Sequence, residues 1–579
     1  MTGLTHSPDS FVFKTDRPWP NARLRVGAIV GHATSSSVRL WLRTGQPGSF
    51  TLFVYARDRV VEAHRGEAAL RLALSAVPME PADVATTLSP VLQRDFEITD
   101  YASDTTIVID TDGLEPDTAY GYALLDRRRA CMILGHNRLR RFRTPPEESE
   151  RRPFQFALLS CHMPFAVNGL FRKRTEASGV DMWDFLDAAL RRHGHEVDLV
   201  IAGGDQAYSD GVDTLNIWQY LNARMARDGD RLLPDREAML SWYRDIHRGY
   251  WGFESLQRVF DSFPTYMIWD DHEIVDGWGS HYFDADSGQD GLAQLLPDYR
   301  ERGLSYDDGM TLVRRMVGAA QQTYLEYQHS HNPATLPGVF DYSFERGGCA
   351  FYVLDGRGHR DISRSSHRIL GREQFDRFAG WAAAVDPAET PFMFVVSAVP
   401  VLHTRSAVVN ADEYLGGLGD DLRDSWEHEL HDAERAALME VLFDAAARGI
   451  KVGVLSGDVH ASAAFSIEDD DGNRVYQLTS SAITQNVSRI ASWALRLGAA
   501  DDGETAEGYR FRRLALYTEP SFALISVDPL NGEAWFKLYG GQKLDVPPAA
   551  GGQTEPLTHS LAKIQISQRA AEEVGGPRG

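Results

Sequence analysis

The chain has 579 residues, of which 43% are hydrophobic and 10% aromatic, a composition typical of ordered globular proteins. Two domains are expected, because a single hydrophobic core seldom serves so many residues. The 59 Lys and Arg against 82 Asp and Glu give a net charge of -23. A field of that sign repels nucleic-acid backbones and anionic membranes. The charge therefore argues against nucleic-acid binding, although a local basic pocket can still hold a small phosphate.

The cysteine content and the N-terminal sequence indicate in which cellular compartment the protein is expected. The three cysteines, Cys131, Cys161 and Cys349, are too few and too scattered for a disulfide framework. Residues 1–20 lack the charged-then-apolar pattern of a secretory leader, and no apolar run approaches the length of a bilayer span. We expect a soluble, cytoplasmic protein from the sequence as it stands, and an exported one if a leader has been removed.

The first part of the chain predicts a β domain. After an extended arm over residues 1–24, strands are expected where apolar side chains alternate or cluster, at 38–43, 51–55 and 106–109. Leu114–Tyr120 and Phe142–Pro145 resemble the L-x-P-x-T-x-Y turn and the closing F-x-T-P of fibronectin type III-like sandwiches. We predict such a sandwich over residues 25–146, with another small β-sandwich as the alternative. A linker rich in Pro and Glu follows.

From residue 151 onward, short apolar runs alternate with longer helix-like stretches, which is the pattern of a layered α/β domain. Six of these runs end abruptly in polar or metal-capable residues. The six pairs are Phe154–Leu159 before Ser160–His162, Val197–Ala202 before Gly203–Tyr208, Tyr266–Trp269 before Asp270–Glu273, Ala350–Leu354 before Asp355–Arg360, Phe392–Val396 before Ser397, and Lys451–Leu455 before Ser456–His460. Because ligands of α/β sheets bind beyond the carboxyl ends of strands, these endings predict one common site.

The stretch Thr265–Glu273 gives the most direct indication of a metal site. A short apolar run reads as a buried strand, and Asp270, Asp271 and His272 follow it at once. Charged groups at the end of a buried strand need compensation, and a metal ion compensates adjacent carboxylates and an imidazole most simply. The alternative is a solvated loop after a strand.

The remaining segments complete the predicted catalytic domain over residues 151–545. A helix is expected at 434–447, from the spacing of its leucines and valine. Late strands are expected at 476–479, 522–527 and 534–539. Irregular loops over the site are expected at 280–310 and 405–425, and residues 546–579 are predicted to form a mobile tail.

Five motifs occur in a characteristic order: Ser-Cys-His, Gly-Asp-x-x-Tyr, Trp-Asp-Asp-His-Glu, Leu-Asp-x-Arg and Gly-Asp-Val-His. Together they resemble the alkaline phosphatase D (PhoD-like) family of calcineurin-like metallophosphoesterases, over roughly residues 25 to 545. The resemblance implies a four-layer α/β sandwich, with two mixed sheets flanked by helices, preceded by the N-terminal β-sandwich.

The resemblance also implies a dinuclear metal site. Asp205 would bridge two ions; Cys161, Tyr208 and His460 would complete the first, and Asp271 and Asp458 would hold the second. A thiolate with a phenolate suits Fe³⁺, whereas a carboxylate site suits Ca²⁺, Mn²⁺ or Zn²⁺.

Four further residues are candidates for contact with the substrate. The resemblance places His272 beside the scissile phosphate, where it would stabilise charge or protonate the leaving group. Arg357 could donate guanidinium hydrogen bonds to phosphate, and Arg360 is a second candidate that the sequence favours less. His162 stands where the family pattern has Gln, and it either touches the substrate or packs in the core.

We therefore predict a metal-dependent hydrolase of phosphate esters, acting on phosphodiesters, phosphomonoesters or both. A metal-bridging hydroxide would attack phosphorus without a covalent phosphoenzyme. The alternative enzyme reading keeps this site but hydrolyses phospholipid head groups or organophosphate triesters, so the expected partner is a small-molecule or lipid phosphate ester. A catalytically dead scaffold protein is disfavoured, because every expected ligand type is present.

Overall fold

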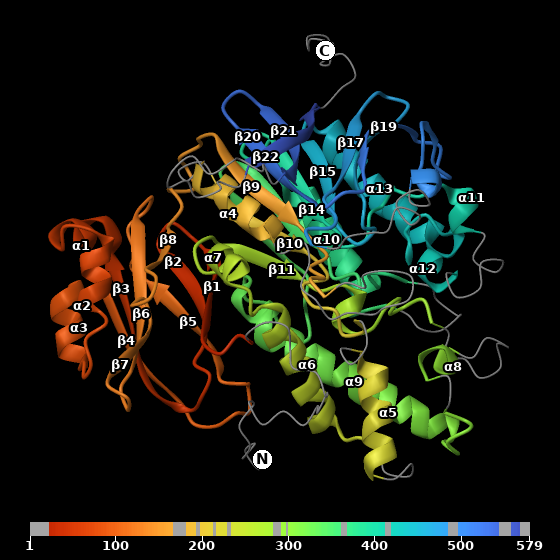
Figure 1. The fold of residues 1–579 in the computed structure, drawn as a ribbon. Helices are drawn as coiled ribbons and strands as arrows, with labels where there is room; N and C mark the ends of the chain where they lie inside the picture. The colour runs from red at the N-terminus through yellow and green to blue at the C-terminus, as the bar shows by residue number, and fades with distance from the viewer. Residues whose placement is uncertain are drawn as a thin grey trace.

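The computed structural model describes residues 23–165, 181–192, 197–211, 216–228, 233–281, 291–296, 299–360, 368–410, 419–484, 496–542 and 557–567. The N-terminal strands form a small body beside a larger α/β body (Figure 1). The two bodies are joined by buried polar contacts. Asp261 forms ion pairs with Arg138 and Arg140, and its carbonyl accepts a hydrogen bond from the Tyr122 hydroxyl at 2.9 Å.

The N-terminal body contains two antiparallel sheets. The first sheet has the order β1 (Gly27–Ala33), β2 (Ser37–Arg43) and β5 (Thr106–Asp112); the second has β4 (Leu92–Ile98), β3 (Gly48–Ala56), β6 (Ala119–Asp126) and β7 (Cys131–Leu134), with β8 (Arg140–Arg143) also paired to β6. The three strands predicted here are confirmed as β2, β3 and β5. Tyr120 Oη accepts a hydrogen bond from Glu115 N at 2.8 Å within the predicted turn. The likeness to fibronectin type III stays a prediction.

Three helices between β3 and β4 were not predicted: α1 (Arg57–Ala63), α2 (Glu67–Ala73) and α3 (Pro81–Leu88). Alternate side chains of a strand point to opposite faces of its sheet. In β3, Leu52 and Val54 pack in the core between the sheets, whereas Phe53 and Tyr55 pack under these helices. A strand that is apolar on both faces requires a cover on each, and the helices provide the second one.

The larger body contains two mixed sheets. The first has the order β11 (Thr265–Ile268), β10 (Val197–Gly203), β9 (Phe154–Leu159), β20 (Ser521–Asp528), β21 (Glu533–Gln542) and β22 (Leu557–Ile566). Strands β9, β10 and β11 run parallel, so their carboxyl ends lie at one edge.

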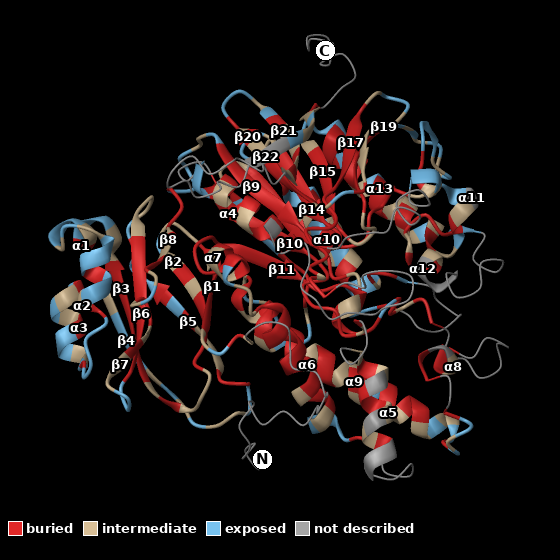
Figure 2. Ribbon diagram, in the orientation of Figure 1, coloured by how far each residue is buried: buried red, intermediate tan, exposed pale blue. Residues whose placement is uncertain are grey.

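The second sheet has the order β12 (Tyr342–Arg346), β13 (Cys349–Val353), β14 (Phe392–Val396), β15 (Lys451–Ser456), β17 (Arg474–Thr479), β16 (Ser462–Glu468), β19 (Arg510–Tyr517) and β18 (Gly503–Glu504). The two sheets face each other across an aromatic core, in which the Phe156 ring lies 5.3 Å from Phe351 and 5.2 Å from Phe394. The central strands are buried along their length (Figure 2). The late strands predicted from the sequence are confirmed as parts of β17, β20 and β21.

Helices cover the outer faces of both sheets (Figure 1). On the first sheet lie α4 (Asp181–Arg192) and α7 (Glu254–Phe260), and on the second lie α10 (Arg372–Ala384) and α13 (Asp432–Ala447), which confirms the predicted helix. The remaining described helices are α5 (Ile217–Asp228), α6 (Arg236–Tyr250), α8 (Gly291–Leu295), α9 (Tyr306–Tyr327), α11 (Ser406–Val409) and α12 (Gly419–Asp424), with short 3-10 turns at Asp271–Glu273, His329–His331 and Glu429–His431. No helix in the described part of the chain has the length and apolar character needed to cross a bilayer.

Two sequence predictions need correction. The predicted tail contains β22, which pairs antiparallel with β21, and the side chain of Ile566 is buried in the core. Apolar residues in this segment therefore complete the edge of the first sheet. The predicted loops at 280–310 and 405–425 contain the helices α8, α11 and α12 and the start of α9, while residues 282–290, 297–298 and 411–418 lie outside the described residues.

Candidate metal centre

The first predicted ligand group assembles where β9, β10 and β15 end. Cys161 follows β9, Asp205 and Tyr208 follow β10, and His460 follows β15. The Cys161 Sγ lies 3.5 Å from Asp205 Oδ2. The Tyr208 hydroxyl lies 3.1 Å from the same carboxylate oxygen and 3.2 Å from His460 Nε2. Segments separated by as many as 300 residues therefore bring their predicted ligands to one point, as the strand-end argument predicts.

A second group shares Asp205 with the first. Carboxylate oxygens of Asp205, Asp270, Asp271 and Asp458 all lie within 4.8 Å of one another. Asp271 and Asp458 were the predicted ligands of the second ion, whereas Asp270 was not assigned to it. Asp205 thus lies between a sulfur, oxygen and nitrogen donor set on one side and a carboxylate set on the other.

The backbone is strained at four of the six predicted ligands. The φ angles of Cys161, Asp205, Asp458 and His460 are 56°, 59°, 63° and 51°. Residues with side chains seldom adopt this left-handed region, and each such residue costs about 1–3 kcal/mol. Strain of this kind persists only where the surroundings determine the conformation, so its concentration here marks a functional site.

Glu273 is the group that holds the strained loop after β10. Its carboxylate accepts hydrogen bonds from the backbone N–H of Asp205 at 3.1 Å, Gln206 at 2.6 Å and Ala207 at 3.2 Å. It also accepts one from Asp270 N at 2.8 Å, which ties the ends of β10 and β11 together. Sequence reasoning gave Glu273 no role, although its place in the Trp-Asp-Asp-His-Glu motif was a signal.

The electrostatics of the cluster favour a bound cation. Burial, and then neighbouring carboxylates, raise the pKa of Asp458 well above its usual range. Burial also raises the pKa of Asp205, although His272 opposes the shift. Burial opposes ionisation of Asp271 too, but His272 and Arg357 hold its pKa at about 2. Excess buried negative charge of this kind is stabilised by cations.

Two further observations test whether metal ions fit these residues. The Oδ1 atoms of Asp205 and Asp271 are buried and accept no hydrogen bond from the described residues. Buried oxygens of this kind ordinarily have a partner. The thiol, phenol and imidazole of the first group and the carboxylates of the second are ordinary metal donors, so the residues present fit a dinuclear centre.

His272 lies beside the cluster and is oriented by Asp210. Its Nδ1 is 2.8 Å and 3.0 Å from the two Asp210 oxygens, and its ring lies 4.0 Å from the Tyr208 ring. Asp276 has an oxygen 3.7 Å from His272 Nε2, and its side chain is 61% exposed. Sequence reasoning missed Asp210, whose only signal is its position two residues after Tyr208.

Comparison with known proteins identifies the family of the chain. Residues 178–493, more than half of the chain, match the model of the family described as PhoD-like phosphatase. The chain belongs to the PhoD-like phosphatase family. The family expected from the five motifs is thereby confirmed.

Three known proteins are similar to the chain. An uncharacterized protein of Saccharomyces cerevisiae, YGR266W, is 21% identical over 336 residues. That match covers 47% of this chain and 46% of the yeast protein, so the chain spans about half the length of this curated relative. A solved structure of PhoD has a TM-score of 0.60 at 16% identity and covers 96% of this chain and 92% of its own. Purple acid phosphatase PPD1 from yellow lupin (Lupinus luteus) seeds has a TM-score of 0.48 at 11% identity, with 96% and 76% covered.

Arg357 lies among the carboxylates of this PhoD-like site. It is fully buried, contacts Asp270, and donates to both oxygens of Asp424 at 2.6 and 2.7 Å and to the Trp278 carbonyl at 2.8 Å. Its Nη2 also lies 3.4 Å from Asp271 Oδ1. The predicted contact with phosphate stays a prediction. The geometry favours another role, in which Arg357 holds the carboxylates in place.

His162 is also buried, and both of its ring nitrogens have partners within the protein. Nε2 lies 2.8 Å from the Tyr250 carbonyl, and Nδ1 accepts a hydrogen bond from Trp183 Nε1 at 3.1 Å. Burial lowers the pKa of His162 to about 4. Of the two alternatives left open by the sequence, this geometry favours packing over contact with substrate.

Proposed function

We propose that this protein is a metal-dependent phosphoesterase that hydrolyses phosphodiesters, phosphomonoesters or both. One observation supports the proposal: the Asp205 carboxylate lies between two groups of side chains that could each hold a metal ion. Membership of the PhoD-like phosphatase family supports it.

The donor sets suggest two different ions. Cys161, Tyr208 and His460 with Asp205 would hold Fe³⁺, because a thiolate and a phenolate suit a strongly polarising ion. Asp271 and Asp458 with Asp205 would hold Ca²⁺, Mn²⁺ or Zn²⁺. When bound, two such ions neutralise the phosphate and lower the pKa of water to within reach of neutral pH.

The protein would supply His272 as a proton donor and hold its ring in a fixed orientation. Asp210 fixes the His272 ring through Nδ1, which leaves Nε2 as the atom that would face a leaving-group oxygen. Glu273 fixes the backbone on which Asp205 stands, and Arg357 fixes Asp270 and Asp424. A catalytic group held in this way is ready for proton transfer without further ordering.

The test is hydrolysis of nitrophenyl phosphate beside bis-nitrophenyl phosphate, with and without a chelator, together with metal analysis. We expect turnover of at least one ester, its loss with chelator and its return with a divalent ion. The exposed Asp376→Asn on α10 is a matched control for Asp205→Asn, because Asp376 lies outside the cluster. Turnover that persists in the Asp205→Asn variant with its metal content unchanged would refute the assignment.

A further inference from the structure

A cavity of about 290 Å³ lies at the junction of the two bodies, away from the metal centre. The N-terminal body contributes the start of α1 and strand β8, and the larger body contributes the starts of β10 and β11 and the end of β12. Its charged lining residues are Arg57, Asp58, Arg141, Arg143, Asp198 and Arg346. Four arginines around one cavity are unexpected in a chain whose net charge is -23.

The four arginines differ in how their charge is compensated. Arg57 pairs with Asp58 at 2.6 Å and with Glu67, and Arg143 pairs with Asp117 at 2.8 Å. The other two, on β8 and β12, form no ion pair within the part of the chain that the structure describes.

Arg346 is 5% exposed and donates a hydrogen bond to the Ala33 carbonyl at 3.1 Å. Arg141 is partly buried, and its guanidinium forms no hydrogen bond or ion pair with any described residue. Its neighbour Arg140 points to the other face of β8 and pairs with Asp261 at 2.7 Å. Thus two adjacent arginines differ, because one has a carboxylate partner and the other faces the cavity.

The anions near Arg141 do not outweigh the opposing effects on its charge. Burial, and then the charges of Arg191 and Arg57, lower its pKa, while Asp187 and Glu67 act more weakly in the opposite direction. Asp198 also lines the cavity, but it forms no ion pair within 4.0 Å among the described residues, and burial raises its pKa against the opposing charge of Arg346. A partly buried guanidinium without an ion-pair partner is unfavourable, and a bound anion would reduce that cost.

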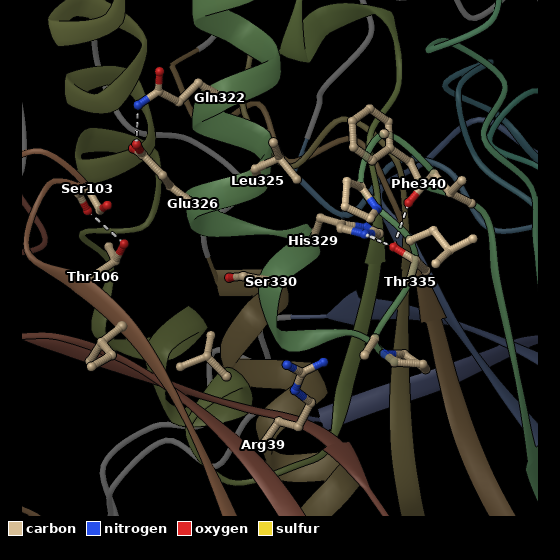
Figure 3. Close-up of a pocket in the computed structure, with 18 residues that line it drawn as sticks. Arg39, Ser103, Thr106, Gln322, Leu325, Glu326, His329, Ser330, Thr335 and Phe340 are labelled. Atoms are coloured by element: carbon tan, nitrogen blue, oxygen red, sulfur yellow. Dashed lines mark hydrogen bonds between the residues drawn. The ribbon is translucent and has the colours of Figure 1, made fainter. Parts of the chain in front are cut away.

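A second cavity at the domain junction provides a contrast (Figure 3). It measures about 620 Å³ and lies between β5 and α9. Several of its polar groups bond one another: Gln322 Nε2 donates to Glu326 at 2.7 Å, and His329 lies 2.9 Å from the Thr335 hydroxyl. Its one arginine, Arg39, pairs with Asp110 at 2.9 Å. That cavity therefore offers no uncompensated charge to a ligand.

We propose that the 290 Å³ cavity binds a phosphate-type oxyanion, free or at the end of a small phosphate ester, through Arg141 and Arg346. Guanidinium groups recognise such oxyanions by paired, charge-assisted hydrogen bonds. The site lies at the amino ends of β10 and β11, whereas the metal ligands follow their carboxyl ends. The seven residues of β10 span roughly 20 Å, so the two sites are separate. A bound anion would bridge the two bodies, because Arg141 and Arg346 belong to different ones.

The test measures binding of inorganic phosphate to the full chain after chelator treatment, by calorimetry and by thermal shift, at constant ionic strength. We expect phosphate to bind and to raise the melting temperature, while chloride does not. Arg141→Gln should weaken phosphate binding by about tenfold or more, as expected for loss of a hydrogen bond to a charged group. The matched control is Arg127→Gln, because Arg127 is an exposed arginine of the same body that pairs with Asp95; it should bind as the parent does.

Three additional measurements make the result decisive. Arg141→Lys, which keeps the charge, should restore part of the affinity, and Asp205→Asn should leave phosphate binding unchanged. Repeating the titration with glycerol phosphate distinguishes the two sources of the oxyanion, since the tighter ligand identifies the physiological class. The proposal is overturned if chelator-treated protein binds no phosphate, or if folded Arg141→Gln, judged by circular dichroism, binds it as tightly as the parent.

Discussion

Strands β10 and β11 carry opposite charge at their two ends. Beyond the carboxyl ends, Asp205, Asp270 and Asp271 gather in a buried cluster. At the amino ends, Arg141 and Arg346 line a cavity. The acidic end already contains a compensating guanidinium, Arg357, and needs further cations, whereas the basic end has an arginine with no partner among the described residues. Charge that the chain leaves uncompensated inside a fold therefore indicates the sign of the missing ligand.

The largest expected effect is at the acidic end. Asp205→Asn removes the one carboxylate shared by both donor sets, so we expect turnover to fall by more than the roughly 10- to 100-fold typical of an outer metal partner. Metal analysis and kcat on a nitrophenyl ester measure it. Unchanged turnover with both metals still bound would show that Asp205 does not bridge them.

The second effect tests whether Arg357 belongs to the carboxylates or to the substrate. Arg357→Gln leaves Asp270 buried without its counter-charge and Asp424 paired with Arg360 alone, and breaking a buried pair in this way costs about 3–5 kcal/mol. Urea denaturation of metal-free protein measures it. A variant that keeps its stability but shows a raised KM would instead assign Arg357 to phosphate binding, as the sequence predicts.

The third effect distinguishes proton donation by His272 from the orientation of its ring by Asp210. Loss of a general acid typically costs about 10²- to 10⁴-fold, and we expect such a fall in kcat for His272→Ala. Asp210→Asn should cost less, because the imidazole remains and only its orientation by the carboxylate is lost. Steady-state kinetics with a poor and a good leaving group provide the measurement. Equal losses for both leaving groups would argue against proton donation by His272.

The difference between the two ends also explains what could be predicted from the sequence. The six strand endings were predictable, and so was the convergence of Cys161, Asp205 and His460 beyond them, because parallel strands end at one edge. The roles of these three residues as candidate ligands came from the resemblance to the family. The family motifs supplied the rest of the predicted set.

What escaped prediction depends on contacts between distant segments. Asp424 meets Arg357 from α12, and Asp210 meets His272 across 62 residues. No local pattern marks such pairs. The burial of His162 is likewise invisible in the sequence, because it is set by Trp183 and Tyr250.

The local architecture was missed for a similar reason. The helices α1–α3 cover the second face of β3, and the apolar residues of 51–55 on both faces were a signal for such a cover. Strand β22 has exposed and half-buried positions along most of its length, so its sequence lacks the apolar pattern of a buried strand. Only its pairing with β21 identifies it as a strand. Edge strands are stabilised by their neighbours more than by their own composition.

The smallest expected effect sharpens the contrast between Arg357 and Arg141. In phosphate-free buffer, Arg141→Gln should change the free energy of unfolding by no more than about 0.5 kcal/mol, because Arg141 has no partner to lose among the described residues. Relief of repulsion from Arg57 and Arg191 makes a slight stabilisation the expected sign. Added phosphate should then stabilise the parent but not the variant. If Arg141→Gln cost as much as Arg357→Gln in phosphate-free buffer, Arg141 would have to be satisfied within the protein, and the basic cavity would need no ligand.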